Sequence, residues 1–325
     1  MIWPIDIDDV RRAAERIRPH LSPTALRDYA PLDAVVGAGI EVLVKHENHQ
    51  PTNSFKVRNA LSAVSALGDE ERRGGLIAAT RGNHGAGLAW AGRRFGAPVV
   101  VVVPHGNNPE KNAAIRGYGA ELVEAGDDYD QAALAAEELR RARGLRTVHS
   151  TNDRDVLAGA GTLSLELFDQ APPLDAMVIS VGGGSQALGA LTVARALRPS
   201  LKVYAVQAAG ASAMHDAVTS GVPRTHERAV TFADGIATRA PYALTYPSLQ
   251  AGLAGFVTVT EGEIAAAVRT LLSTTHQLVE GAGAAGLAGL VKLRAELAGR
   301  RVAIVLSGGN IDLPTLRAVV NDDLR

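Results

Sequence analysis

Cysteine is absent from the 325 residues of this chain. Its absence excludes disulfide frameworks, thiolate metal sites and thiol nucleophiles. An excess of charge is also missing, because 33 Lys and Arg residues face 34 Asp and Glu residues and leave a formal net charge of -1. The chain therefore has no global basic field that would attract nucleic acid or an anionic membrane surface. We expect neither of them as a partner.

Long hydrophobic runs are lacking as well. No segment offers about 18 uninterrupted apolar residues, and Asp6, Asp8 and Asp9 stand where a secretory signal would need basic residues. We therefore expect a cytoplasmic protein. The length fits two domains or one large α/β unit, but no repeat, low-complexity tract or charge block marks a linker. Residues 147–153 are a plausible hinge.

Short β-branched runs alternate with Ala- and Leu-rich segments of helical period. This pattern is typical of parallel strands joined by crossover helices, and it predicts an α/β fold. The strands that we expect are 76–79, 99–103, 121–124, 176–180, 203–206 and 302–306. The helices that we expect are 85–95, 110–118, 128–143, 185–198, 261–274 and 284–298.

Lys56 lies in segment 50–60, where a turn rich in Pro, Thr, Asn and Ser meets a helical stretch. A lysine in this place can be held in a partly desolvated pocket, which lowers its pKa enough for Schiff-base formation. The other interpretation is a solvated lysine in the first turn of a helix, since short motifs also occur by chance.

Two segments combine the end of a strand with glycines and the start of a helix. In 79–85, the backbone N–H groups could hold a carboxylate or a phosphate, although an ordinary capped turn has the same pattern. In 179–185, Gly182, Gly183 and Gly184 precede Ser185, so the backbone can approach an anion at a helix N-terminus. This pattern predicts a phosphate cradle. Its spacing fits neither dinucleotide nor P-loop motifs, which favours a small phosphorylated cofactor.

Two further residues are candidates on chemical grounds. Ser307 follows an apolar strand, where its hydroxyl could exchange hydrogen bonds with a ring nitrogen without carrying charge, or could belong to a simple strand-end turn. Glu280 could place a carboxylate at a helix start for function or for N-terminal capping alone.

Together, in this order and spacing, the motifs resemble the fold-type-II pyridoxal-phosphate enzymes, and specifically the serine/threonine dehydratase and serine racemase group. The resemblance covers nearly the whole chain. The matching segments are Ser54-Phe55-Lys56, Gly82-Asn83-His84, Gly182-Gly183-Gly184, Ala233-Asp234-Gly235, Glu280 with Ala282-Gly283, and Ser307-Gly308-Gly309-Asn310.

The resemblance implies a fold like that of the tryptophan synthase β chain, with two doubly wound parallel-sheet domains and the cofactor between them. A large domain, 1–59 with 151–325, would bind pyridoxal 5'-phosphate. A small domain, 60–150, would bind the substrate. The resemblance also implies a homodimer.

The resemblance assigns roles to single residues. Lys56 would carry the cofactor as a Schiff base, with Phe55 packed beside it. Asn83 would bind the ring hydroxyl, Ser307 the ring nitrogen, and Gly182 to Ser185 the phosphate. The other cofactor-binding residues that it implies are Gly235 and Glu280. The substrate-binding residues that it implies are Ser54, Thr80, Arg81, Gly82, Asn83 and His84.

The activity implied is that of an ammonia-lyase, which converts a β-hydroxy amino acid of the threonine, serine or 3-hydroxyaspartate type to a 2-oxo acid and ammonia. Lys56 would act as general base and the cofactor as electron sink. A neutral serine at the ring nitrogen would favour β-elimination over transamination.

The chain departs from the group at several positions. Asn59 stands where glycine is usual, and Gln207 and Ala213 stand where many relatives carry the acids of a divalent-metal site, so we predict no such metal. Arg81 replaces a small residue, which in serine racemase is the second base, so racemase activity should be weak. The chain also lacks the C-terminal regulatory extension of the allosteric enzymes, and feedback by isoleucine is not expected.

The guanidinium of Arg81 suits a second carboxylate, which makes 3-hydroxyaspartate or a similar amino acid a competitor to threonine and serine as substrate. The alternative is that Arg81 turns away to pair with Asp127 or Asp128.

Other functions remain open at this point: a racemase, a β-replacing synthase, or a catalytically silent binding protein that kept the fold. The synthases typically carry Gly-Asn-Thr where this chain has Gly82-Asn83-His84, and a silent protein has no physical reason to keep the whole set of motifs. A dinucleotide-binding protein is disfavoured because no strand is followed by the required glycine spacing and a later acid.

Overall fold

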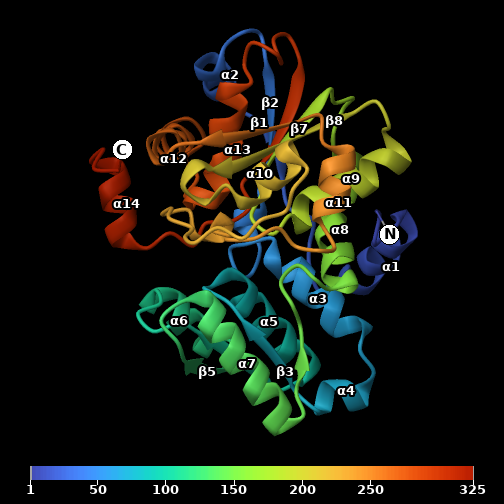
Figure 1. Ribbon diagram of the computed structural model, residues 1–325. Helices are drawn as coiled ribbons and strands as arrows, with labels where there is room; N and C mark the ends of the chain where they lie inside the picture. Colours follow the sequence, from blue (N-terminus) through green and yellow to red (C-terminus); the bar gives the residue numbers. More distant parts are fainter. Residues whose placement is uncertain (1, 325) are drawn as a thin grey trace.

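The computed structural model describes residues 2–324, which form two sheets, one in the upper and one in the lower part of Figure 1. The strand order is β1-β2-β10-β7-β8-β9 in the six-stranded sheet and β5-β4-β3-β6 in the four-stranded sheet. The strands are β1 (Leu26–Asp28), β2 (Glu41–Lys45), β3 (Leu76–Ala79), β4 (Val99–Val103), β5 (Glu121–Glu124), β6 (Arg146–Thr147), β7 (Ala176–Ser180), β8 (Lys202–Ala208), β9 (Gly255–Val259) and β10 (Arg301–Val305).

The pairing is parallel throughout, except that β1 runs antiparallel to β2. The six-stranded sheet brings both ends of the chain together, since β2 lies beside β10 with Val42 opposite Val302. The four-stranded sheet takes its strands from the continuous stretch 76–147.

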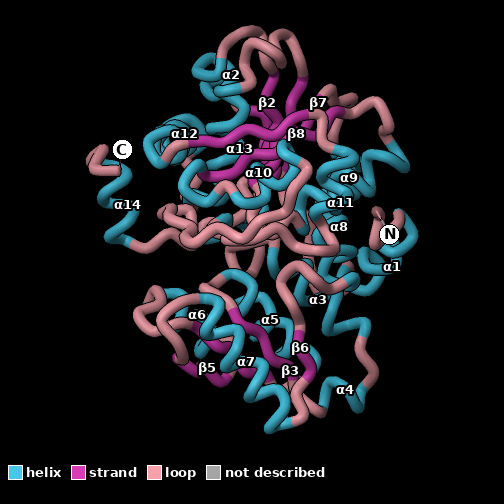
Figure 2. Tube along the Cα trace, viewed as in Figure 1, coloured by secondary structure: helices cyan, strands magenta, loops and turns pink. Residues whose placement is uncertain are grey.

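Helices surround both sheets, as Figure 2 shows. They are α1 (Ile7–Ile17), α2 (Ala30–Val36), α3 (Lys56–Ala66), α4 (Asp69–Arg73), α5 (Asn83–Phe95), α6 (Pro109–Gly117), α7 (Tyr129–Arg143), α8 (Arg154–Gln170), α9 (Ser185–Leu197), α10 (Ala213–Ser220), α11 (Tyr246–Gly252), α12 (Glu261–Thr275), α13 (Gly281–Lys292) and α14 (Leu313–Val320). Short 3₁₀ turns are η1 (Glu47–His49), η2 (Ala209–Ala211) and η3 (Asp234–Ile236). None of the described helices is both long and apolar enough to span a membrane.

The apolar runs form buried strands. All five valines of β4 are buried, as expected for a strand that is covered on both faces. Helix α3 lies between two other helices because glycines let them approach its first turn. A Cβ on Gly87 of α5 would lie 2.9 Å from the carbonyl oxygen of Lys56, and one on Gly159 of α8 would lie 2.5 Å from that of Arg58. This close packing fixes the start of α3.

The predicted α/β fold with two parallel sheets is confirmed, and β3, β4, β5 and β7 have the predicted bounds. The helix predicted for 284–298 was misplaced, since α13 begins at Gly281 and ends at Lys292. Its glycines are poor helix formers in isolation, but they allow a close contact: a Cβ on Gly283 would lie 2.7 Å from the carbonyl oxygen of Gly308. Packing therefore outweighs propensity here. The division into domains at 59/60 and 150/151 stays a prediction.

Candidate active site

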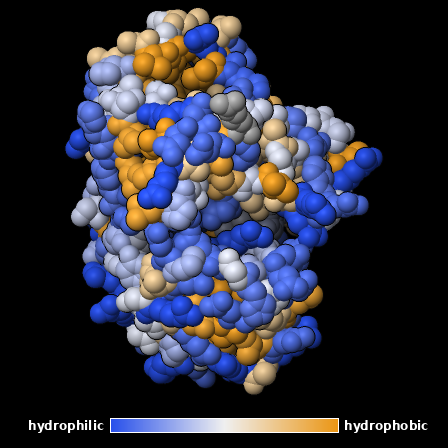
Figure 3. Space-filling view, turned by 90° about the vertical axis from the view of Figure 1, so that its left-hand side faces the viewer, coloured by the Kyte–Doolittle hydropathy of each residue, from blue (hydrophilic) through white to orange (hydrophobic). Residues whose placement is uncertain are grey.

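A cavity of about 610 Å³ lies where the carboxyl ends of β3, β7 and β10 meet. This is where ligands bind in open α/β sheets. The cavity brings together every site residue predicted from the sequence. Those residues are Ser54, Phe55, Lys56, Thr80, Arg81, Gly82, Asn83, His84, Gly182, Gly183, Gly184, Ser185, Gly235, Glu280 and Ser307. On the face in Figure 3, hydrophilic residues predominate along the waist between the upper and lower parts of the molecule.

Lys56 is the first residue of α3 and faces the cavity. Its Nζ lies 3.5 Å from both the carbonyl oxygen of Ser150 and the hydroxyl of Ser185, and 4.9 Å from the centre of the Phe55 ring. Among residues 2–324, no carboxylate forms an ion pair with it. Burial lowers the pKa of Lys56 to about 8. A neutral, nucleophilic amine is therefore accessible near physiological pH.

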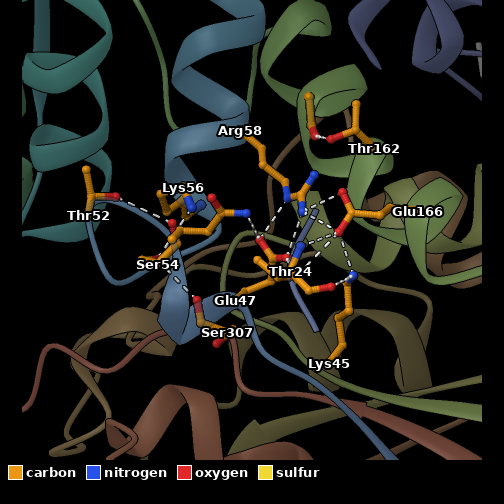
Figure 4. Close-up of polar contacts among 12 residues, drawn as sticks. Thr24, Lys45, Glu47, Thr52, Ser54, Lys56, Arg58, Thr162, Glu166 and Ser307 are labelled. Atoms are coloured by element: carbon orange, nitrogen blue, oxygen red, sulfur yellow. Dashed lines mark hydrogen bonds and ion pairs between the residues drawn. The ribbon is translucent and has the colours of Figure 1, made fainter. Parts of the chain in front are cut away.

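A buried network of charges holds the start of α3 (Figure 4). The guanidinium of Arg58 donates to Glu47 at 2.8 and 2.9 Å and to Glu166 at 3.0 Å to each oxygen. The ammonium of Lys45 lies 2.5 Å from Glu166. Two cations are thus matched by two carboxylates, which compensates the cost of burying them. The sequence reasoning missed this network, because its members are up to 121 residues apart.

Two contacts fix the segment before Lys56 to the end of β10. The N–H of Phe55 donates to the carbonyl oxygen of Ser307 at 3.0 Å, and the hydroxyl of Ser54 donates to the same oxygen at 3.2 Å. Ser307 is therefore held opposite the lysine, while its own hydroxyl binds no other side chain or backbone group in the described part of the chain.

The glycines of 182–184 make a tight loop before α9. Gly184 has a φ of +89°, which glycine adopts without steric cost. A Cβ on Gly183 would clash with the Thr151 hydroxyl, and one on Gly182 would lie 2.9 Å from Cα of Ile236. The N–H groups of Gly183, Gly184 and Ser185 have no acceptor among residues 2–324, so they are free to bind an anion at this helix start.

A second helix start faces the cavity at Asn83, where α5 begins. The Nε2 of His84 lies 2.8 Å from the carbonyl oxygen of Val148, so Nε2 carries the hydrogen. Burial lowers the pKa of His84 to about 3, and the ring is neutral. A carboxylate bound here would therefore meet backbone N–H groups of α5 and not an imidazolium.

The side chain of Asn83 is oriented by two residues from the part of the chain around the six-stranded sheet. Its Nδ2 donates to Glu280 at 2.6 Å, and its Oδ1 accepts from Asn310 at 2.8 Å. Burial raises the pKa of Glu280, and the nearby ammonium of Lys111, 3.8 Å from Glu280, opposes that rise. Lys111 also lies 2.5 Å from Asp234. The sequence reasoning missed Lys111, which looks like an ordinary helical surface lysine.

Arg81 is exposed on the cavity wall and pairs with no carboxylate in the part of the chain that the structure describes. The pairing with Asp128 considered above is not found, because Asp128 and Asp130 face Arg239 at 3.5 and 2.9 Å. The guanidinium of Arg81 is thus available to a ligand.

At the position considered for a metal, Gln207 is fully buried and uses its side chain for protein contacts. Its Oε1 accepts from the N–H of His215 at 2.9 Å, and its Nε2 donates to the hydroxyl of Thr238 at 3.2 Å. Within residues 2–324, no group of three or more His, Asp or Glu side chains is arranged to hold a metal ion. The absence of a metal stays a prediction.

Comparison with known proteins gives consistent matches. The family described as "Pyridoxal-phosphate dependent enzyme" matches residues 17–308. An L-threonine ammonia-lyase of Thermotoga maritima is 35% identical over 320 residues, which are 98% of this chain and 79% of the relative.

Solved structures agree with these matches. The processed form of threonine deaminase isoform 2 from Solanum lycopersicum superposes with a TM-score of 0.89 at 28% identity, over 98% of this chain and 94% of that one. A serine racemase of Dictyostelium discoideum superposes with a TM-score of 0.88 at 31% identity, over 95% of this chain and all of that one.

Proposed function

We propose that this chain, which belongs to the family of pyridoxal-phosphate dependent enzymes, is an ammonia-lyase that converts a β-hydroxy amino acid to a 2-oxo acid and ammonia. One observation carries the proposal: the half-buried Lys56, without a carboxylate partner among the described residues, shares a cavity with the free N–H groups of a glycine loop. Named threonine ammonia-lyases and deaminases among its relatives support this class of reaction.

The residues present fit pyridoxal 5'-phosphate. Residues 182–185 would hold its phosphate, because their N–H groups lack protein acceptors among residues 2–324. The tight loop requires glycine, since a Cβ at Gly182 or Gly183 would collide with Ile236 or Thr151. Lys56 would attach it, and Ser307 would offer its ring nitrogen an uncharged partner. When bound, the cofactor supplies an electron sink for the α-carbanion.

The remaining steps fall to side chains and backbone of this chain. The first turn of α5, with Thr80 and Asn83, would bind the substrate carboxylate by N–H and hydroxyl donors. Nζ of Lys56, whose pKa burial lowers to about 8, would remove the α-proton. That proton is then available on Nζ to the departing β-hydroxyl.

Arg81 bears on which β-hydroxy amino acid is used. Arg81 lines the cavity and has no carboxylate partner among residues 2–324, which supports a substrate with a second acidic group, such as 3-hydroxyaspartate, beside threonine and serine. The same residue disfavours racemisation, because a guanidinium carries no acceptor and is a poor base.

The organisation of the protein is also part of the proposal. Residues 60–150 would form the substrate-binding domain, and residues 1–59 with 151–325 the cofactor-binding domain. The protein would act as a cytoplasmic homodimer. Light scattering on the purified protein measures its molar mass in solution. A mass of one chain would contradict the proposed homodimer.

The activity is tested by measuring 2-oxo acid and ammonia released from threonine, serine and 3-hydroxyaspartate. Wild type should release both products in equal amounts from at least one substrate. Lys56→Ala should abolish release, whereas Lys202→Ala, at an exposed lysine of β8, should not. Failure of wild type on all three substrates, or an active Lys56→Ala variant, would contradict the proposal. Chiral analysis of the remaining amino acid would detect a racemase.

A further inference from the structure

Six consecutive residues, 234–239, line the cavity from the side of the six-stranded sheet, and we name them the strap. They belong to the yellow to orange loops that run along the junction of the upper and lower parts in Figure 1. An ion pair joins each end of the strap to helices around the other sheet. Asp234 lies 2.5 Å from Lys111 of α6, and Arg239 lies 2.9 Å from Asp130 at the start of α7.

The two ion pairs have opposite polarity. At one end the strap carries the acid, and at the other end it carries the base. Arg239 also lies 3.5 Å from Asp128. A strap of this charge pattern fits the facing helices in one direction only, so the pairs set its position as well as holding it.

The strap packs directly against the loops expected to bind the cofactor. A Cβ on Gly182 would lie 2.9 Å from Cα of Ile236 and 3.0 Å from the carbonyl oxygen of Gly235. A Cβ on Gly235 would lie 2.9 Å from Cβ of Ala282, which is in the first turn of α13. No side chain separates these segments. A displaced strap would therefore leave the glycine loop without support on this side.

The strap is held to its own side by packing of Ile236 in the core of the six-stranded sheet and by hydrogen bonds near its second end. The amide of Gln207 donates to the hydroxyl of Thr238, and the N–H of His226 donates to the carbonyl oxygen of Arg239 at 2.7 Å. At the Asp234 end, Lys111 and Asp234 are 9% and 31% exposed, whereas Arg239 and Asp130 at the other end are 36% and 52% exposed. The buried pair should therefore matter more than the exposed one.

We propose that Lys111 and Arg239 are positioning residues, which hold the strap across the cavity and thereby keep the glycine loop in the form that retains the cofactor. Closure of the two parts of the molecule around the cavity and retention of the cofactor are then coupled. This inference rests on the proposed function, because it assumes that the glycine loop binds the cofactor phosphate.

A charge exchange at the Arg239 end tests the proposal. Arg239→Glu places an acid against two acids, whereas Arg239→Glu with Asp130→Arg restores an ion pair of reversed polarity. Arg143→Glu is the matched control, because Arg143 pairs at 2.8 Å with Glu121 and both belong to the elements of the four-stranded sheet. The measurements are the rate of cofactor loss from the holoenzyme and the hydrogen exchange of amides 234–239.

Arg239→Glu should speed cofactor loss about threefold to fivefold, which is the upper part of the range for a partly exposed charge contact, and should speed exchange in the strap. The double variant should return both rates to within about twofold of wild type, and the control should leave them unchanged. Unchanged rates in Arg239→Glu, or a double variant no better than the single one, would overturn the proposal.

The buried end is tested with Lys111→Met, with Arg116→Met on the same helix as control, since Arg116 pairs with Glu124 on the surface. Lys111→Met should speed cofactor loss more than Arg239→Glu does, and circular dichroism should remain that of wild type. A smaller effect than that of Arg239→Glu would contradict the prediction that the Lys111–Asp234 pair matters more than the Arg239–Asp130 pair.

The design separates this inference from the proposed function. The ion pairs require no cofactor, so hydrogen exchange of the strap should differ between wild type and Arg239→Glu in the apoprotein too. A wild type that binds no pyridoxal phosphate, with this difference present, would refute the proposed function alone. A wild type that binds it, with no difference in exchange, would refute the strap alone.

Discussion

Replacement of Arg58 by methionine removes the guanidinium that lies between Glu47 and Glu166. Arg58 makes four hydrogen bonds with the two carboxylates, and its side chain is 3% exposed. Glu47 is fully buried, and in the variant its nearest remaining donors are the hydroxyl of Thr24 at 2.7 Å and the amide of Gln50 at 3.1 Å. Leaving a buried charge without its partner costs about 3–5 kcal/mol.

The assay is thermal unfolding of wild type, Arg58→Met and the surface control Arg116→Met. At an unfolding entropy of about 2.1 cal/mol/K per residue, the loss corresponds to a Tm lower by about 4–7 °C, against about 1 °C or less for the control. Equal shifts in the two variants would refute the reasoning. Because Arg58 is one helical half-turn from Lys56, cofactor binding should weaken as well.

The pH dependence provides a second check on this network. Burial alone would raise the pKa of Glu47, but Arg58 outweighs burial and holds that pKa below its ordinary value. A carboxyl whose pKa is lower in the folded state contributes stability above its unfolded pKa and loses it as the pH falls through the folded one. The Tm difference between wild type and Arg58→Met should therefore shrink on acidification below about pH 4.5. A Tm difference that does not change with pH would contradict the stabilisation of the Glu47 carboxylate by Arg58.

Three further outcomes are expected. Reconstitution of the apoprotein with pyridoxal phosphate should speed up as the pH rises through about 8, because burial lowers the pKa of Lys56 to about 8 and only the neutral amine attacks an aldehyde. Stopped-flow absorbance measures this rate. A rate that stays constant from pH 6 to 9 would contradict Lys56 as the attacking amine. Arg81→Ala should cut kcat/KM for 3-hydroxyaspartate by about 10- to 150-fold and leave threonine nearly unchanged, while equal losses on both would rule out recognition of a distal carboxylate. Chelators should leave activity and Tm nearly unchanged, because Gln207 and Ala213 supply no carboxylates; a loss that magnesium or calcium restores would reveal a missed metal site.

The site motifs could be predicted because each is a short stretch with its own backbone chemistry. Gly182 to Ser185 and Gly82 to His84 both consist of a strand end followed by a helix start, a pattern that can be recognised from adjacent residues. Parallel strands place their carboxyl ends at one edge of a sheet, which is why segments so far apart line one cavity. The matched family confirms the predicted resemblance and the pyridoxal-phosphate dependence.

Residues that act through distant partners could not be predicted. Lys111 and Asp234 are 123 positions apart, and nothing in the sequence indicates that Lys111 pairs with the Asp234 of segment 233–235. Arg58 and Glu166 are 108 apart. Their pairing depends on how α3, α6 and α8 pack. That packing depends on glycines at close contacts, which only the folded structure reveals.

One missed element did carry a local signal. Helix α1 begins after Asp6, whose carboxylate accepts from the N–H groups of Asp8 and Asp9, while the side chain of Asp9 accepts from the N–H of Asp6. An acid three residues before another acid, ahead of the apolar period of Val10, Ala13 and Ile17, is a capping box and predicts a helix.

The central claim is that Lys56 attaches pyridoxal phosphate in the cavity between the two sheets. Borohydride reduction of the purified yellow protein, followed by peptide mass spectrometry, tests it most directly. The account predicts loss of the visible band and a permanent pyridoxyl-phosphate adduct on Lys56. An adduct on a different lysine, such as Lys111, or a protein that holds no cofactor after incubation with an excess of it, would contradict the account.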